Sequence, residues 1–133
     1  MGDHQAERSR AGVDPLNRYP AYVKAMAFYE HVADDTDRMM SDPRSKSIAC
    51  QLFNAASSIG ANFEEGYGRG TTPEFIHRLH IATGEAREAR GWYRRAARFL
   101  PPELAARRAA EADEAIAPLT ATIRGLERKR ASQ

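Results

Sequence analysis

Residues Ser47–Phe63 read SIACQLFNAASSIGANF and are followed directly by EEGYGRGTTPEF at residues 64–75. None of the 17 residues in the first stretch is charged, although 29% of the whole chain is. Its apolar residues recur at steps of three and four, which is the spacing of one helix face. These residues are Ile48, Leu52, Ala55, Ile59 and Phe63. The stretch therefore predicts a helix.

The opposite side of this helix is also apolar or small. It carries Ala49, Phe53, Ala56, Ser57 and Gly60, where a surface helix would carry charges. A helix that is apolar all round is normally buried all round, and a chain of 133 residues has little interior to surround it. We therefore expect another copy of the protein to cover part of this helix, with Phe53, Ser57 and Gly60 at the interface.

Composition and charge favour one soluble domain. The formal net charge of +2 permits an anionic partner without requiring one. Cys50 is the only cysteine, so it has no disulfide partner within the chain, and we expect it to be a small core residue. No apolar run reaches the 18 residues of a membrane span, and residues 1–12 lack a secretory signal's apolar segment. The expected location is the cytoplasm.

Periodicity and helix-stop signals predict an all-α protein, an up-down-up-down four-helix bundle. The expected helices cover residues 20–40, 45–66, 72–100 and 102–127. The expected organisation is a disordered tail at 1–16, the bundle at 17–128 and a frayed end at 129–133.

Three details concern where the helices begin, end or break. Pro43 should exclude the loop Ser41–Arg44 from any helix. Thr71 and Glu74 fit a capping box at the start of the third helix. Pro118 should bend or break the fourth helix, because it lacks an N–H donor and its ring clashes with the preceding turn.

The segment IGANFEEGYGR at residues 59–69, with Glu74-Phe75 and the Leu79-x-Ile81-Ala82-x-Gly84 run, resembles a known family. This is the four-helix-bundle family named for the 23S rRNA intervening sequence, and the similarity covers roughly residues 20–127. The resemblance implies a bacterial homopentamer without catalytic residues. It also extends to accessory proteins of diversity-generating retroelements, which implies binding of nucleic acid or of another protein.

The sequence departs from the family pattern at four positions. Phe53-Asn54 stands where an Arg-Arg pair is frequent, Gly60 stands for a usual proline, and Glu64 for a usual alanine. The loss of two cations and the gain of an acid weaken the expectation that the second helix binds nucleic acid.

A basic strip is expected on the third helix. Arg87, Arg94 and Arg98 fall on one side of it, with His80 in line. Such a strip is either a solvated surface that complements the helix dipole or a contact for phosphates. Gly84 and Gly91 lie seven residues apart on the outer side of the same helix, which suggests close packing there against another subunit.

Catalytic, metal and cofactor sites are not expected. Glu74-x-x-His77 is one half of a di-iron motif that needs two such pairs, and His77 and His80 fit surface histidines better than a metal site. The Gly66–Gly70 loop lacks the Lys-Ser/Thr ending of a phosphate loop, so its glycines fit a helix–helix turn. Ser57 and Ser58 lack a recognisable histidine–acid pair.

The turn residues Asn62 and Glu65 are expected to bond turn amides or a neighbouring subunit, beside Gly66, Gly68 and Arg69. The expected function is a non-catalytic oligomeric scaffold or adaptor that contacts RNA or DNA through the basic strip. The first alternative is a scaffold that binds only proteins. The second is a metal-dependent helical-bundle enzyme.

Overall fold

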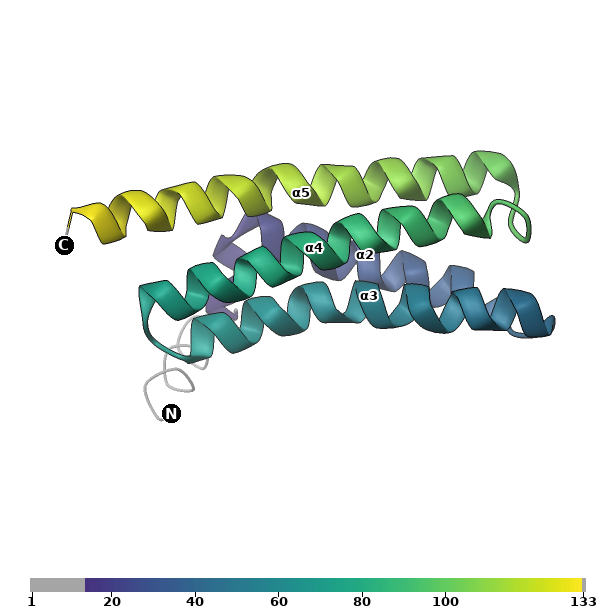
Figure 1. Ribbon diagram of the computed structural model, residues 1–133, viewed down its shortest axis with the longest axis horizontal. Coiled ribbons are helices and arrows are strands. Elements are labelled where there is room, and N and C mark those ends of the chain that lie inside the picture. Colours follow the sequence, from purple (N-terminus) through teal and green to yellow (C-terminus); the bar gives the residue numbers. More distant parts are fainter. Residues whose placement is uncertain (1–13, 133) are drawn as a thin grey trace.

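The computed structural model describes residues 14–132 as helices and short turns (Figure 1). A short 3-10 helix, η1 (Pro15–Arg18), precedes four α-helices, and no strand occurs among the described residues. The helices are α2 (Pro20–Asp37), α3 (Pro43–Gly68), α4 (Thr72–Ala96) and α5 (Pro102–Ala131). The all-helical fold predicted from the sequence is confirmed.

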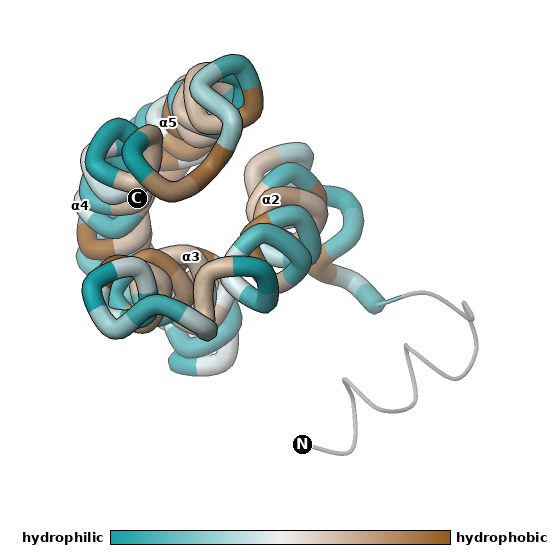
Figure 2. The backbone as a smooth tube through the Cα atoms, turned by 90° about the vertical axis from the view of Figure 1, so that its right-hand side faces the viewer, coloured by the Kyte–Doolittle hydropathy of each residue, from teal (hydrophilic) through white to brown (hydrophobic). Residues whose placement is uncertain are grey.

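The four helices lie side by side around a common core, as the end view shows (Figure 2). Helix α3 packs against α2 and α4, and α5 packs against α4 and α2. Short connections join consecutive helices, so neighbours run in opposite directions (Figure 1). As a result, α2 and α3 form one side of the bundle, and α4 and α5 form the opposite side.

The core is built from the apolar stripes that the sequence pattern indicated. On α4, six buried residues recur at steps of three and four: Phe75, Leu79, Ala82, Ala86, Ala89 and Tyr93. Half of these are alanines, whose small side chains let α3 and α5 approach α4 closely. In the turn after α2, which ends at Asp37 and not at the predicted residue 40, Met39 is buried and Met40 is exposed.

Two helix starts differ from the sequence prediction. Pro43 is the first residue of α3 and not part of a loop, because proline needs no N–H in the first turn. The Asp42 carboxylate caps this turn by accepting from the backbone N–H groups of Arg44 and Ser45, at 2.8 and 3.3 Å. Thr71 precedes α4 as predicted, but its side chain makes no cap hydrogen bond, so the predicted capping box is wrong.

Pro118 does not break α5, which runs without interruption from Pro102 to Ala131. Of the expected bend or break, the break is therefore wrong. Ala115, Leu119 and Ile123 are buried on both sides of Pro118 and hold the helix against the core. Their packing outweighs the lost hydrogen bond.

The chain ends are also more helical than expected. Of the predicted tail at 1–16, residues 1–13 lie outside the described residues. Asp14 caps η1 by accepting from the backbone N–H of Leu16 at 3.0 Å, and Leu16 is buried. At the other end, α5 includes residues 129–131 of the predicted frayed segment. Among the described residues, no helix is long and apolar enough to cross a membrane.

Candidate interaction surfaces

Exposed apolar side chains are concentrated on the α2/α3 side of the bundle. Among the described residues, the exposed large hydrophobic side chains all belong to α2, the turn after it, or α3. They are Val23, Met26, Met40 and Phe53, which are 36–47% exposed. Scattered apolar residues are normal on a protein surface, but a group on one side indicates an interaction site.

Two shallow grooves follow the line where α2 meets α3. A groove of about 340 Å³ is lined by Met40, Cys50 and Phe53, and a second of about 290 Å³ by Met26, Tyr29 and other residues. The rings of Tyr29 and Phe53 lie between them, with centroids 5.5 Å apart. We call this surface, made of Met26, Tyr29, Met40 and Phe53, the apolar ridge.

Cys50 lies in the groove and is exposed, so the expectation of a buried thiol is wrong. The physical reason is the position of α2. It covers the side of α3 that carries Ala49, Ala56 and Gly60, which are buried, while the side that carries Cys50 and Phe53 remains open.

The residues predicted for an oligomer interface fall in three places. Phe53 and Ser57 lie on the α2/α3 side, where the Ser57 hydroxyl donates to the carbonyl of Phe53 at 2.7 Å. Gly60 lies inside the chain, because a Cβ there would meet the Met26 sulfur at 3.0 Å. It allows α2 to pack on α3 and does not itself reach a partner. Gly84 and Gly91 lie on α4, away from this side.

Two acids border the apolar ridge. Glu30 and Asp37 lie seven residues apart on one line of α2, are exposed, and have no ion-pair partner among the described residues. Glu64, which replaces the usual alanine of the resembled family, accepts a hydrogen bond from the Tyr22 hydroxyl at 2.7 Å. That acid therefore serves contacts within the chain.

The structure separates the five arginines of residues 87–98 into two groups. Arg90 forms an ion pair with Asp113 of α5, and the Arg95 guanidinium lies 4.9 Å from the centre of the Trp92 ring. Arg87, Arg94 and Arg98 are exposed and have no partner among the described residues. We call these three, with exposed His80, the basic strip.

One member of the basic strip, Arg94, lines a groove between α4 and α5. This groove has a volume of about 420 Å³ and is lined by Arg94, Asp113, Pro102 and a set of alanines. The alanines are Ala97, Ala105, Ala106, Ala109 and Ala110. Short side chains leave a mainly apolar trough, which we call the alanine groove, on the side of the bundle opposite the apolar ridge.

The turn between α3 and α4 is held by contacts within the chain. The Asn62 amide donates to the carbonyl of Ser58 at 2.8 Å and accepts from Arg78 at 3.4 Å. Glu65 accepts from Arg69 at 2.6 and 2.9 Å. The prediction that Asn62 and Glu65 bond turn amides is therefore wrong.

Two glycines explain the sequence of this turn. A Cβ on Gly66 would come within 2.9 Å of side-chain atoms of Phe75 and Arg78, so glycine lets α3 and α4 meet closely. Gly70 has a φ of +79°, which glycine adopts without strain. Gly68 ends α3 with open space around it.

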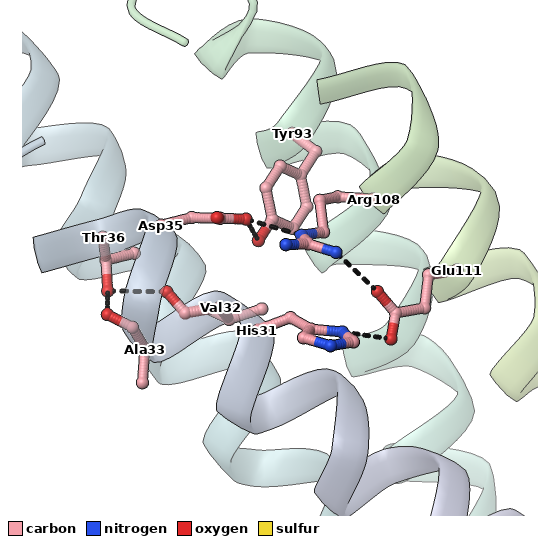
Figure 3. Close-up of polar contacts among 8 residues, drawn as sticks. All are labelled: His31, Val32, Ala33, Asp35, Thr36, Tyr93, Arg108 and Glu111. Atoms are coloured by element: carbon pink, nitrogen blue, oxygen red, sulfur yellow. Dashed lines mark hydrogen bonds and ion pairs between the residues drawn. The ribbon is translucent and has the colours of Figure 1, made fainter. Parts of the chain in front are cut away.

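A buried polar network joins α2, α4 and α5, and the sequence analysis missed it (Figure 3). The Asp35 carboxylate accepts from the Tyr93 hydroxyl at 2.7 Å and from Arg108 Nε at 2.8 Å. Glu111 continues the network, 3.5 Å from Arg108 and 2.7 Å from His31 Nδ1. Asp35 is only 1% exposed, so its charge depends on these partners.

The network fixes the protonation of Tyr93 and Arg108. Burial, together with the hydrogen bond to Asp35, raises the pKa of Tyr93, so the phenol stays neutral and acts as a donor. Burial alone would lower the pKa of Arg108, but the hydrogen bond and charge of Asp35 outweigh it and raise that pKa. A fixed donor pair of this kind holds a carboxylate in place and offers no proton to transfer near neutral pH.

Other chemical groups stay apart. No cluster of three or more histidine, cysteine, aspartate or glutamate side chains that could hold a metal occurs among the described residues. Glu74 lies 3.4 Å from Arg78 and not with a histidine, while His77 and His80 are exposed on α4. The hydroxyl of Ser58 donates to the carbonyl of Asn54 at 2.9 Å, as Ser57 does to Phe53.

Comparison with known proteins gives the same fold. A solved protein of unknown function, from the S23 ribosomal protein family of Bacteroides thetaiotaomicron, superposes with a TM-score of 0.72. The match covers 77% of this chain and 97% of that one at 22% sequence identity. None of the curated proteins compared with this chain matches it.

The family model for the 23S rRNA-intervening sequence protein matches residues 17–120. These residues include the last two residues of η1, the whole of α2, α3 and α4, and α5 through Thr120. The resemblance first indicated by the Asn62–Arg69 segment thus extends over most of the bundle. The chain belongs to the 23S rRNA-intervening sequence protein family.

Proposed function

We propose that this protein is a non-catalytic scaffold that associates with further copies of itself. The observation that carries the proposal is the apolar ridge, because the exposed large apolar side chains of the described residues gather on one side of the bundle. Covering such a surface removes apolar area from water, which is the main favourable term in protein association.

The absence of catalysis is part of the proposal. Ser57 and Ser58 direct their hydroxyls to backbone carbonyls of their own helix, which leaves neither poised for attack on a substrate. Arg108 and Tyr93 are held by Asp35 inside the core, at residues that line none of the surface grooves described above. These arrangements support a structural role.

Phe53→Glu tests self-association. Light scattering coupled to size-exclusion chromatography should give the unaltered protein a mass above the 14.8 kDa of one chain. The variant should elute as a monomer, because a carboxylate desolvated without a partner costs several kcal/mol. Gln51→Glu is the matched control, since it adds the same charge two residues away on an exposed part of α3. A monomeric unaltered protein would refute the proposal.

Nucleic-acid binding through the basic strip is a second candidate function. It is favoured by three exposed arginines without partners among the described residues: Arg87 and Arg94 on α4, and Arg98 in the turn after α4, which ends at Ala96 and not at the predicted residue 100. Phosphate contacts need spaced cations of this kind, and they release counterions when they form. This candidate function uses the basic strip and not the apolar ridge.

Titration of mixed-sequence RNA and DNA at several salt concentrations tests this candidate. Binding by three arginines should weaken steeply as salt rises from about 50 to 200 mM. The triple change Arg87→Glu, Arg94→Glu and Arg98→Glu should abolish it. The matched control reverses three exposed arginines of α5: Arg107, Arg124 and Arg128. Equal loss in both triple variants would show a response to net charge and would argue against a defined strip.

A further inference from the structure

The two opposite sides of the bundle have complementary shapes. The α2/α3 side carries the large exposed side chains of the apolar ridge, such as Met26 and Phe53. The α4/α5 side carries the alanine groove, which is about 420 Å³ in volume. Large side chains on one surface and a trough lined by alanines on another are the two halves of a close-packed interface.

The charges at the edges of these surfaces are also complementary. Asp37 lines a groove of the apolar ridge, and Glu30 precedes it by seven residues on α2. Arg94 lines the alanine groove, and Arg87 precedes it by seven residues on α4. All four side chains are exposed. None of the four has an ion-pair partner among the described residues. Opposite charges at the rims of two surfaces steer association and fix its register.

The spacing of the charges matches as well. Each pair lies seven residues apart on one helix, and a helix rises about 1.5 Å per residue, so each pair spans about 10.5 Å. The two acids can therefore face the two arginines at the same time when α2 of one copy lies along α4 of another. Gly84 projects no side chain from α4 near this line and has open space around it, which leaves room for the approach of a second backbone.

We propose that the apolar ridge of one copy seats in the alanine groove of the next copy, with Glu30 and Asp37 against Arg87 and Arg94. The inference rests on the proposed self-association and adds to it which surfaces meet. Because the ridge and the groove lie on opposite sides of one bundle, the pairing is head to tail. Head-to-tail contacts close into a ring when the rotation between copies allows it, whereas a ridge-to-ridge contact would stop at a dimer.

Two variants with one intact surface each test the pairing. Phe53→Glu removes the ridge and keeps the groove, while the double change Arg87→Glu and Arg94→Glu removes the groove edge and keeps the ridge. Each should be a monomer alone. Mixed in equal amounts, they should form a one-to-one pair of twice 14.8 kDa and grow no further, because only one intact ridge and one intact groove remain.

Two additional variants make the test independent of any one substitution. Ala106→Phe fills the groove at an exposed position without changing the charge, and it should also give a monomer. Reversing all four charges in one chain, with Glu30→Arg and Asp37→Arg added to the arginine changes, should restore assembly. Circular dichroism of each variant should retain the helical spectrum.

The outcomes separate this inference from the proposed function. If Phe53→Glu is monomeric while the arginine variant and Ala106→Phe keep the mass of the unaltered protein, self-association stands and the ridge-to-groove pairing is wrong. If the mixture of monomers forms no pair, the pairing is also wrong. If the arginine variant keeps its assembly but no longer binds RNA, the strip serves nucleic acid and not the next copy. An unaltered protein that is itself monomeric would overturn both proposals.

Discussion

The two halves of the bundle core are held in different ways. Near the turn between α3 and α4, the rings of Tyr19, Phe63, Tyr67 and Phe75 pack edge to face, with centroids 5.2–6.3 Å apart. In the half where α4 ends and α5 begins, Asp35 is held by Tyr93 and Arg108. One half depends on shape and the other on directed polar contacts.

This difference has a consequence for tolerance to substitution. Aromatic contacts are numerous and individually weak, so the loss of one ring edge leaves the others in place. The polar network has one buried carboxylate at its centre, and each partner makes a single bond to it. We therefore expect the polar half to respond more strongly to a single change.

Asp35→Ala should have the largest effect on stability, a loss of about 3–5 kcal/mol in the free energy of unfolding. The change leaves the Tyr93 hydroxyl and the Arg108 guanidinium without their shared acceptor inside the core. Urea unfolding followed by circular dichroism measures it. Asp34→Ala, at an exposed neighbouring position, is the control and should change stability by less than about 0.5 kcal/mol. Equal effects of the two changes would show that the network adds nothing.

Phe63→Leu should cost less, about 1–2 kcal/mol. The side chain is fully buried and its ring meets Tyr19 and Phe75 at 5.2 and 5.4 Å, so leucine keeps most of the apolar volume but loses the edge contacts. The same urea titration measures this change. A loss as large as that of Asp35→Ala would contradict the proposed difference between the two halves.

The aromatic half could be predicted from the sequence because it follows helix periodicity. Phe63 and Phe75 stand in apolar stripes with steps of three and four residues, and such stripes determine which face enters a core. The glycine-rich turn between α3 and α4 could be predicted for a similar reason. Gly70 has the positive φ that a break between helices often requires.

The polar half could not be predicted from one sequence. Asp35 falls among the charged residues Asp34 and Asp37, and the sequence does not show which partners would hold a buried acid there. Those partners are Tyr93 and Arg108, which are 58 and 73 residues away along the chain. One signal was available: Asp35 follows Phe28 and Val32 at helical spacing on the buried face of α2. An acid on an apolar stripe implies a buried partner.

For the candidate surfaces, too, local sequence patterns do not show which distant residues come together. Phe53 was recognised because a large apolar residue stands on a face without charges, which is a local feature. Gly60 was assigned to the same interface, because the sequence does not show where α2 lies. The alanine groove was missed altogether, since Ala97 and Ala106 come from different helices and form a trough only when α4 and α5 pack side by side.

Tyr93 should make the free energy of unfolding depend on pH, with a smaller effect than the substitutions above. Its pKa is raised above the ordinary value of about 10 in the folded protein, mainly by burial and then by the hydrogen bond to Asp35. The unfolded chain releases the phenol proton near pH 10, whereas the folded chain retains it. The stabilisation is therefore complete below pH 10 and is lost as the pH rises above it, by at most about 1.4 kcal/mol per pH unit for one proton.

Tyr93→Phe removes the phenol proton that causes this pH dependence of stability. Urea unfolding of the variant should show lower stability at pH 7–9, because Asp35 loses a donor, and the difference from the unaltered protein should be constant over that range. Above pH 10 the stability of the unaltered protein should fall more steeply than that of the variant, so that the two values converge. Parallel curves up to pH 11 would mean that Tyr93 titrates equally in both states and that the network does not hold its proton.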